Sequence, residues 1–283
     1  MQAKTPISHS DARGFTLLEV VIAIAISLLI ISAVLGFFWM QRSSADLQQD
    51  VAAVQQDLRG LSQILASNIR MAGYNPQHQE DFAACGGAAF APGFQGNDAG
   101  QPAIQFNNQA CNQAENVATD AAHIAFVADI DGNGQINRDT APPVPPALPP
   151  PLEQIAYRFN PDPAACPGSL SGCIEQYFPG ANPPWQPVAQ NIDGVQFLYR
   201  LNNGADVLNP TQTQLNDIRA VTVTILARAA FRKQGFTDKT IYRPASCPAD
   251  PDTPCPEAFN SGNPWEDSYL RQMLTFTAQC RNM

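Results

Sequence analysis

Apolar and polar residues are distributed unevenly along this chain, and the longest apolar run lies near its start. Residues 20–40 include no charged side chain. At a rise of about 1.5 Å per residue, a helix of this length spans the hydrocarbon core of a bilayer, which is about 30 Å thick. A cleaved secretory signal fits less well, because its apolar region covers about 7–15 residues and ends at a small-residue cleavage site, whereas QRSSADLQQD follows Met40. The run therefore predicts a transmembrane helix.

The helical pattern continues beyond this run in an amphipathic form. Apolar residues recur there at spacings of three and four, the period of one helix face: Leu47, Val51, Val54, Leu58, Leu61, Leu65 and Ile69. We expect one helix over residues 15–72, weakened at Gly36 and Gly60 by about 1 kcal/mol each. It is either a membrane anchor joined to a short coiled coil, or a helix whose outer half packs into a folded head while its inner half packs on other helices.

Beyond residue 76 the pattern changes to short alternating stretches, which are typical of half-buried strands. The candidate strands are residues 123–129, 153–160, 173–178, 188–201, 218–229 and 270–280. A long helix followed by such strands predicts an α+β fold, in which the helix packs on one face of an antiparallel β-sheet with long loops. The proline-rich residues 141–151 predict an extended polyproline connector.

The charged residues indicate which partners the chain can bind and how it is oriented in the membrane. The formal net charge is −9, with only 16 basic residues among 283. We expect no nucleic acid partner, because phosphate binding depends on clustered Lys and Arg. Lys4 and Arg13 precede the apolar run, so the positive-inside rule places the N-terminus in the cytoplasm and everything after about residue 41 across the membrane.

Seven cysteines follow the apolar run, mostly in loop-like surroundings, and this pattern favours an oxidising compartment. The candidate disulfides join Cys85 to Cys111, Cys166 to Cys173 and Cys247 to Cys255, which leaves Cys280 unassigned. The connectivity stays open, because six cysteines alone allow 15 pairings. Zinc is not predicted, since the chain lacks paired Cys or His clusters at zinc-ligand spacing.

Residues 129–135, DIDGNGQ, resemble the start of a calcium-binding loop, with oxygen ligands at alternate positions and a glycine at the sixth. The candidate ligands are Asp129, Asp131, Asn133, the backbone carbonyl of Gln135, and Asp139. The match fails at the twelfth position, where Thr140 replaces the usual bidentate glutamate. The alternative is an Asp-Gly or Asn-Gly turn between two strands. Calcium would stabilise a loop, and no other cofactor is expected.

Enzyme signatures are missing from the chain. It contains no G-x-S-x-G, H-E-x-x-H or G-x-x-x-x-G-K motif. His123 lies in an apolar stretch and is expected to be a strand residue rather than a general base. We therefore expect a protein that is not an enzyme, with no catalytic residue.

The residues around the start of the apolar run carry a family resemblance. The sequence GFTLLE at residues 14–19, followed by the run, resembles the class III signal of type IV prepilins and type II secretion pseudopilins. The resemblance implies that a prepilin peptidase cleaves after Gly14 and N-methylates Phe15. It also implies four parts: a leader at 1–14, a transmembrane and filament-core helix at 15–41, its amphipathic continuation at 42–75, and a periplasmic β-rich head at 76–283.

The physical chemistry of Glu19 agrees with that implication. A carboxylate in the hydrocarbon region costs about 2.5–3.5 kcal/mol on insertion scales, and such residues persist when they find a partner. Cleavage would create an amine on Phe15, four residues earlier on the same helix face. Glu19 could pair with this amine or with that of a neighbouring subunit in the filament. The alternative is that Glu19 only marks the membrane interface.

Three stretches in the C-terminal half of the chain make the family resemblance more specific. They are NIDGVQFLYR at 191–200, DIRAVTVTILAR at 217–228 and YLRQMLTFTAQCRN at 269–282, and they resemble the core of PilW-type minor pilins. This resemblance implies a structural subunit that primes a type IV pilus or sits at its tip. The implied partners are other minor pilins, the major pilin, a large tip adhesin, the prepilin peptidase and the inner-membrane assembly platform.

The implied location is the inner membrane, as a single-pass protein with a periplasmic head, and then the pilus at the cell surface. Two alternatives stay open. The chain could be a J-type pseudopilin of a type II secretion system, which shares the long helix and related strands. It could also be a pilus-associated adhesin whose function lies in the loops at residues 77–122 and 230–266.

Overall fold

The computed structural model describes residues 16–74, 120–128, 154–178, 183–233, 235–250, 252–260 and 264–281, together with five two-residue strands between residues 82 and 116. The chain divides into two compact units, Met1–Gln49 and Asp50–Met283. The proline-rich residues 141–151 and the loop stretch 129–135 lie outside the described residues.

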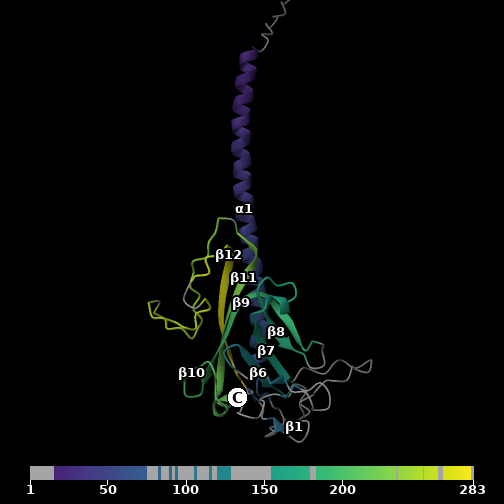
Figure 1. Ribbon diagram of the computed structural model, residues 1–283, viewed down its shortest axis with the longest axis vertical. Helices are drawn as coiled ribbons and strands as arrows, with labels where there is room; N and C mark the ends of the chain where they lie inside the picture. The colour runs from purple at the N-terminus through teal and green to yellow at the C-terminus, as the bar shows by residue number, and fades with distance from the viewer. Residues whose placement is uncertain are drawn as a thin grey trace, which may run out of the picture. The chain divides into compact units, whose positions relative to one another are not determined.

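One helix, α1 (Leu17–Arg70), accounts for the first part of the described chain and is 54 residues long (Figure 1). The predicted single helix over 15–72 is thus confirmed, with slightly later and earlier ends. Its last carbonyls are satisfied by tightened turns, in which the Ala72 N–H donates to Ile69 O at 3.1 Å and the Tyr74 N–H to Met71 O at 2.9 Å. Gly73 adopts a φ of 73°, which only glycine takes up without strain, so it terminates the helix.

The second unit contains an antiparallel sheet that the alternating sequence stretches predicted. Among the described residues it has eight strands in the order β12-β11-β9-β8-β7-β6-β3, with β10 also paired to β9. The strands are β3 (Gly93–Phe94), β6 (His123–Val127), β7 (Gln154–Asn160), β8 (Gly172–Tyr177), β9 (Trp185–Leu201), β10 (Asp206–Val207), β11 (Ile218–Arg232) and β12 (Tyr269–Gln279). All six predicted strands are present, and the α+β prediction is confirmed.

Smaller elements complete the described chain. Two separate hairpins pair β1 (Phe82–Ala83) with β2 (Ala89–Phe90) and β4 (Gln105–Phe106) with β5 (Glu115–Asn116). A short 3-10 helix, η2 (Pro163–Ala165), and a four-residue helix, α2 (Gln212–Leu215), occupy two of the turns. The sequence patterns predicted none of these, because each is too short to show a period.

The core of the second unit lies between the C-terminal part of α1 and one face of the sheet. The buried side of the helix is the predicted stripe from residue 54 onward: Val54, Leu58, Leu61, Leu65 and Ile69. Ala72, just past the end of α1, is buried with them. Leu65 and Ile69 are fully buried, and each such burial contributes about 1.5–3 kcal/mol. The Asn68 amide also donates to the Tyr157 hydroxyl at 2.5 Å. The helix therefore packs into the folded head, as the second of the two interpretations predicted.

The sheet forks between β9 and β11. The two strands pair from Leu201 and Ile218 down to Ile192 and Ala227, with an irregularity at Asp193. Beyond that point β9 pairs with β8 alone and β11 with β12 alone. Asn191 has a φ of 56° at this irregularity, a conformation that asparagine tolerates better than most residues. The fork leaves a gap in the sheet between β9 and β11.

Candidate functional site

Glu19 lies in the first turn of α1 and is bonded to the residue that caps this helix. The backbone N–H and the hydroxyl of Thr16 both donate to Glu19 Oε2, at 3.0 and 3.1 Å. In return the Glu19 N–H donates to Thr16 Oγ1 at 3.3 Å. This reciprocal arrangement is a capping box, which satisfies backbone donors that the helix start leaves free. The T-x-x-E spacing of residues 16–19 is a sequence signal of this capping box that the predictions above did not include.

The capping box changes the environment expected for the Glu19 carboxylate. Oε2 has two local donors, whereas Oε1 accepts no hydrogen bond from any described residue. The carboxylate is thus partly satisfied before any partner approaches, and one oxygen remains for a further donor. Gly14 and Phe15, the predicted cleavage and methylation residues, lie outside the described residues.

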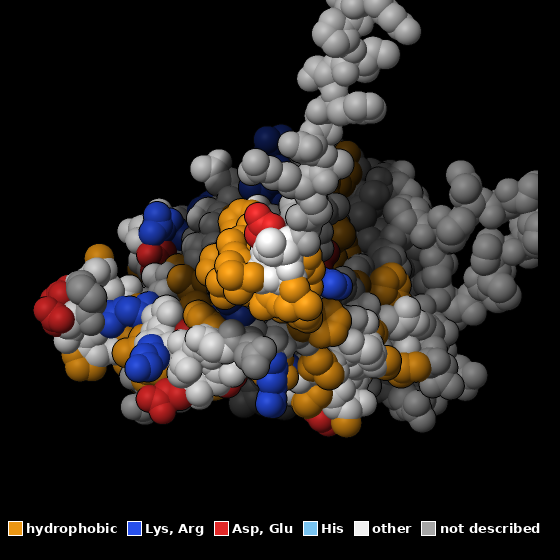
Figure 2. Space-filling view, turned by 90° about the horizontal axis from the view of Figure 1, so that it is seen from above, with side chains coloured by type: hydrophobic (Ala, Val, Ile, Leu, Met, Phe, Trp, Pro, Cys, Tyr) orange, Lys and Arg blue, Asp and Glu red, His pale blue; other side chains and the backbone are white. Residues whose placement is uncertain are grey.

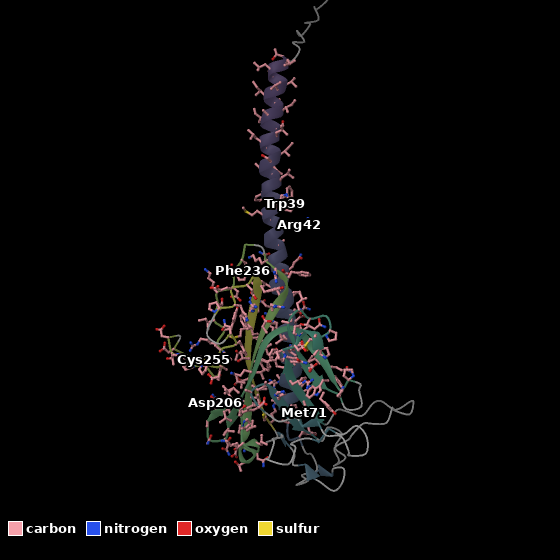
Figure 3. All side chains as sticks on the ribbon, viewed as in Figure 1. Trp39, Arg42, Met71, Asp206, Phe236 and Cys255 are labelled. Carbon is pink, nitrogen blue, oxygen red and sulfur yellow. A yellow bond between two sulfur atoms is a disulfide. The ribbon has the colours of Figure 1, made fainter. Side chains whose placement is uncertain are left out.

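The helix that follows is apolar on every side. Every described residue from 16 to 42 is exposed, and Leu17–Arg42 has a mean hydropathy of 2.9 with none of it buried. Figure 2 shows hydrophobic side chains gathered around this part of α1, and Figure 3 shows them pointing outward in all directions above Trp39 and Arg42. A helix with no polar face is stable in lipid or inside a bundle of helices, not as a surface in water.

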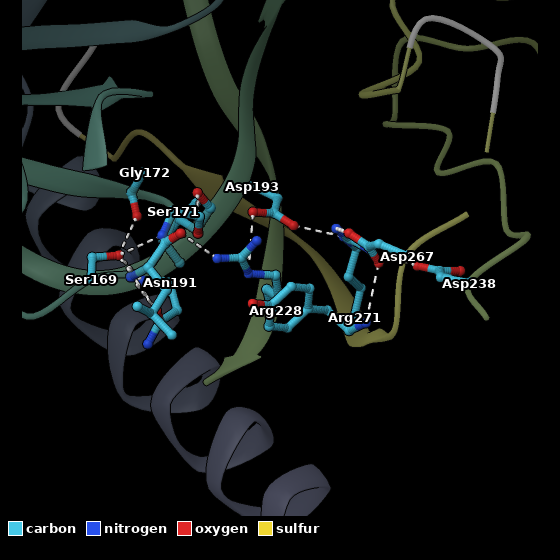
Figure 4. Close-up of polar contacts among 12 residues, drawn as sticks. Ser169, Ser171, Gly172, Asn191, Asp193, Arg228, Asp238, Asp267 and Arg271 are labelled. Carbon is cyan, nitrogen blue, oxygen red and sulfur yellow. Dashed lines mark hydrogen bonds and ion pairs between the residues drawn. The ribbon is translucent and has the colours of Figure 1, made fainter. Parts of the chain in front are cut away.

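A second polar cluster lies in the head, where Arg271 of β12 joins three aspartates (Figure 4). Its guanidinium donates to Asp193 at 2.6 Å, to Asp238 at 2.9 Å and to Asp267 at 2.6 Å. The Arg271 side chain is 1% exposed, and the Trp265 ring centroid lies 4.2 Å from the guanidinium carbon. Because Asp238 and Asp267 belong to the segment between β11 and β12, this cluster ties that segment to the sheet.

The cluster fixes charges in a defined way. Hydrogen bonds from Arg271 are the main reason that the pKa of Asp267 is lowered. Burial alone would lower the pKa of Arg271, but its hydrogen bonds to Asp267 and Asp193 raise it overall. Arg271 is permanently charged, and the three aspartates are its counter-ions. This ion-pair cluster therefore has a structural role, which is to hold the segment between β11 and β12 against the sheet.

Two disulfides lie in the head. The structure joins Cys166 to Cys173, with an S–S distance of 2.06 Å, and Cys247 to Cys255, with an S–S distance of 1.92 Å. Both are pairs that the sequence spacing suggested. Cys85 and Cys111 lie outside the described residues, so that pairing stays a prediction.

Comparisons with known proteins give the N-terminal site its context. Residues 9–35 match a family model described as the prokaryotic N-terminal methylation motif. The N-terminus of this chain thus carries an N-terminal methylation motif. This chain is also similar in structure to the type IV-like pilin TTHA1219 from Thermus thermophilus, with a TM-score of 0.39 and 12% sequence identity over 81% of this chain and 96% of that one. The curated proteins contain no significant match.

In the described part of the chain, His123 is held in a turn beside Asp120. His123 Nδ1 lies 2.9 Å from Asp120 Oδ1, which also accepts the Ala122 and His123 N–H groups. Burial raises the pKa of Asp120, but these hydrogen bonds outweigh it and lower the pKa overall. The Tyr199 hydroxyl, at 2.9 Å from the carbonyl oxygens of both Asp120 and His123, closes the turn. His123 thus begins β6 as a structural residue.

The predicted calcium ligands fall in the part of the chain that is not described. Asp129, Asp131, Asn133, Gln135 and Asp139 all lie outside the described residues, so calcium binding stays a prediction. Among the residues that are described, no group of three or more His, Cys, Asp or Glu could hold a metal. Cys280 is free and buried, and burial raises its pKa to about 12 against a smaller opposing effect of Arg219, which makes this thiol unreactive.

Proposed function

We propose that this chain is a minor pilin, a non-catalytic structural subunit that primes assembly of a type IV pilus or sits at its tip. The observation that carries the proposal is the N-terminal methylation motif at residues 9–35, which overlaps the exposed apolar segment Leu17–Arg42 of α1. A prepilin peptidase would cleave after Gly14 and methylate the new amine of Phe15. The released helix would then pack on equivalent helices of neighbouring subunits.

The apolar surface of α1 suits two environments, the membrane before assembly and the helix-packed core of the pilus after it. Before assembly the span Leu17–Arg42 lies in the inner membrane, with the N-terminus in the cytoplasm and the head in the periplasm. The disulfides at Cys166–Cys173 and Cys247–Cys255 agree with an oxidising periplasm. After extraction, the same surface would be covered by other helices in the pilus, so lipid is exchanged for protein without exposure to water.

Glu19 would direct this exchange. Its Oε1 accepts no hydrogen bond from the described residues, while Oε2 is held by Thr16. The methylated amine of Phe15 in the same or a neighbouring subunit is a donor of opposite charge, and pairing with it would neutralise a charge that is costly in an apolar environment. The other proposed partners are the major pilin, further minor pilins, a tip adhesin and the assembly platform.

Mass spectrometry of the protein from cells that contain a prepilin peptidase tests the processing step. We expect the mature chain to begin at N-methylated Phe15. An intact leader at residues 1–14 in such cells would show that the proposed processing does not occur.

Three substitutions separate the charge of Glu19 from its capping role. Glu19→Gln keeps the capping box but removes the charge, and Thr16→Ala removes the cap but keeps the charge. Glu19→Ala removes both. If charge pairing drives assembly, Glu19→Gln and Glu19→Ala will be inserted and cleaved but absent from sheared pili, whereas Thr16→Ala will be incorporated. Normal incorporation of Glu19→Gln would leave capping as the role of this residue.

The J-type pseudopilin and the adhesin are the alternatives to this proposal. The same N-terminal motif serves a pseudopilin, in which case deletion of the gene would trap secreted enzymes in the periplasm and leave pilus numbers normal. If the chain is mainly an adhesin, deleting residues 77–122 and 230–266 would abolish attachment without loss of pili. Loss of pili on deletion of the gene supports the minor pilin.

A further inference from the structure

A groove lies at the fork of the sheet, on the side of the head formed by α1. Its volume is about 680 Å³. One wall is β9 from Pro187 to Ile192, the other is β11 from Ala227 to Phe231, and α1 from Asp50 to Ile64 lines it as well. Figure 4 shows α1 beside the end of β11 that carries Arg228. The groove is therefore the gap that opens where β9 and β11 part, closed underneath by the helix.

Both strand walls present unpaired backbone to this gap. Below Ile192 and Ala227, β9 hydrogen-bonds only to β8 and β11 only to β12 among the described residues. Each strand consequently has one edge whose N–H and C=O groups have no neighbouring strand. Such an edge is a template for a further strand, and here two edges face the same gap.

The side chains around the gap are those that an extended peptide would cover. Ile64 is 47% exposed, Val188 36% and Phe231 73%, so apolar surface from the helix and both strands is open to solvent. Gly60 of α1 also lines the groove, and a Cβ there would have no neighbour within 4 Å. The absence of a side chain at residue 60 deepens the groove.

The free charge in the groove is negative. Asp50 and Asp57 line it from α1, and neither forms an ion pair with a described residue. Arg228, on the opposite wall, is already engaged: it donates to the Leu170 carbonyl and lies 3.8 Å from Asp193. An occupant should therefore carry Lys or Arg toward the helix side.

We propose that this groove binds an extended segment of a partner protein, which adds as a strand to the free edge of β9 or β11 and places a basic side chain against Asp50 and Asp57. Strand addition supplies main-chain hydrogen bonds, and alternate side chains enter the groove. A helical segment would satisfy its own backbone and leave these edges unpaired. An anionic lipid would be repelled by the two carboxylates. The inference does not depend on which kind of filament the chain joins.

A defined peptide tests the proposal on the full chain in lipid nanodiscs. The probe is a fluorescein-labelled peptide, acetyl-KVTVKVTV-amide, which alternates valine with lysine or threonine. We expect saturable binding that weakens at least fivefold in Asp57→Lys, because the charge is reversed, and in Gly60→Leu, because the groove is filled. Asp252→Lys makes the same charge change in an exposed turn of a different loop and is the matched control, with binding unchanged.

The chemistry of the backbone contact is tested by two further measurements. A probe that is N-methylated at its valines loses backbone donors and should bind at least fivefold more weakly. Amide hydrogen exchange should slow at residues 187–191 and 228–231 when the unmodified probe binds. Equal affinity for Asp57→Lys and Asp252→Lys, protection confined to other strands, or protection by the nanodisc lipid without peptide would each overturn the proposal.

Discussion

At the scale of single residues, Arg271 is the charged side chain that links three aspartates of the head. Its guanidinium joins Asp193 in β9 to Asp238 and Asp267, residues far apart in the sequence. The Asp238 side chain is 1% exposed and that of Asp193 9%. Water could therefore solvate neither carboxylate well if the Arg271 cation were removed. The ion pairs are therefore asymmetric: forming them contributes little net stability, but removing one partner leaves charges buried and unpaired.

Replacing Arg271 with Met should lower the free energy of unfolding by about 3–5 kcal/mol, because the buried Asp238 would lose its cationic partner and Asp193 would keep only Arg228, at 3.8 Å. Urea denaturation followed by tryptophan fluorescence measures this. The control is Arg200→Met, which breaks a pair with Asp206 in which the Arg200 side chain is 60% exposed. That change should leave the free energy of unfolding nearly unchanged, because a solvent-exposed ion pair adds little to stability. Similar losses in the two variants would contradict the structural role of Arg271.

Residue-level features differ in how far the sequence predicts them. Thr16 and Glu19 are three residues apart, and their capping box depends only on local geometry, so it could have been predicted. The Arg271 cluster could not, because its members come together only when β9, β12 and the segment between β11 and β12 are packed. The stacking of Trp265 on Arg271 depends on the same packing of distant segments.

At the scale of elements, α1 combines two helices of different character in one continuous element. Up to Arg42 it is apolar on all sides, and from Val54 it has a buried stripe against the sheet. Gly36 and Gly60 lie inside it without a packing reason, since a Cβ at either position would have no neighbour within 4 Å. Gly60 therefore weakens the helix beside the groove, where its missing side chain leaves space.

Gly60→Ala should raise the free energy of unfolding of the head by about 0.5–1 kcal/mol, because alanine restricts the unfolded chain and favours the helix. Gly204→Ala is the matched control. A Cβ there also has open space, but Gly204 has a φ of +82°, so alanine should destabilise the head by about 1 kcal/mol. Urea midpoints measured side by side decide this, and a destabilising Gly60→Ala would mean that the helix is not intact at residue 60.

The strands show why hydrophobic periodicity predicts where elements lie along the chain better than it predicts how they pair. Alternation in the regions of β9, β11 and β12 was clear in the sequence, because one face of each strand packs on the core. The fork between β9 and β11 left no such signal. It depends on Asn191 at a positive φ and on β9 exchanging β11 for β8 as its neighbour, which are pairing choices between distant segments.

At the scale of the whole molecule, stability depends on carboxylates that must remain ionised. The net charge is −9, yet several of the aspartates are held by specific donors. The pKa of Asp267 is lowered by hydrogen bonds from Arg271, that of Asp206 by Arg200, and that of Asp120 by His123 and backbone N–H groups that outweigh burial. Each of these groups binds a proton less readily in the folded chain than in the unfolded one.

These shifts predict acid sensitivity. A group whose pKa is lower in the folded state stabilises it fully above the unfolded pKa, about 3.9 for aspartate, and loses that contribution as the pH falls toward the lowered folded value. The free energy of unfolding should therefore be nearly constant from pH 7 to 5 and decrease below about pH 4. Urea denaturation at pH 7, 5, 4 and 3 measures this dependence. Asp267→Asn should lessen the decrease below pH 4, because it removes one of the groups that gain a proton on unfolding. A free energy of unfolding that stays constant to pH 3 would show that these carboxylates do not stabilise the fold.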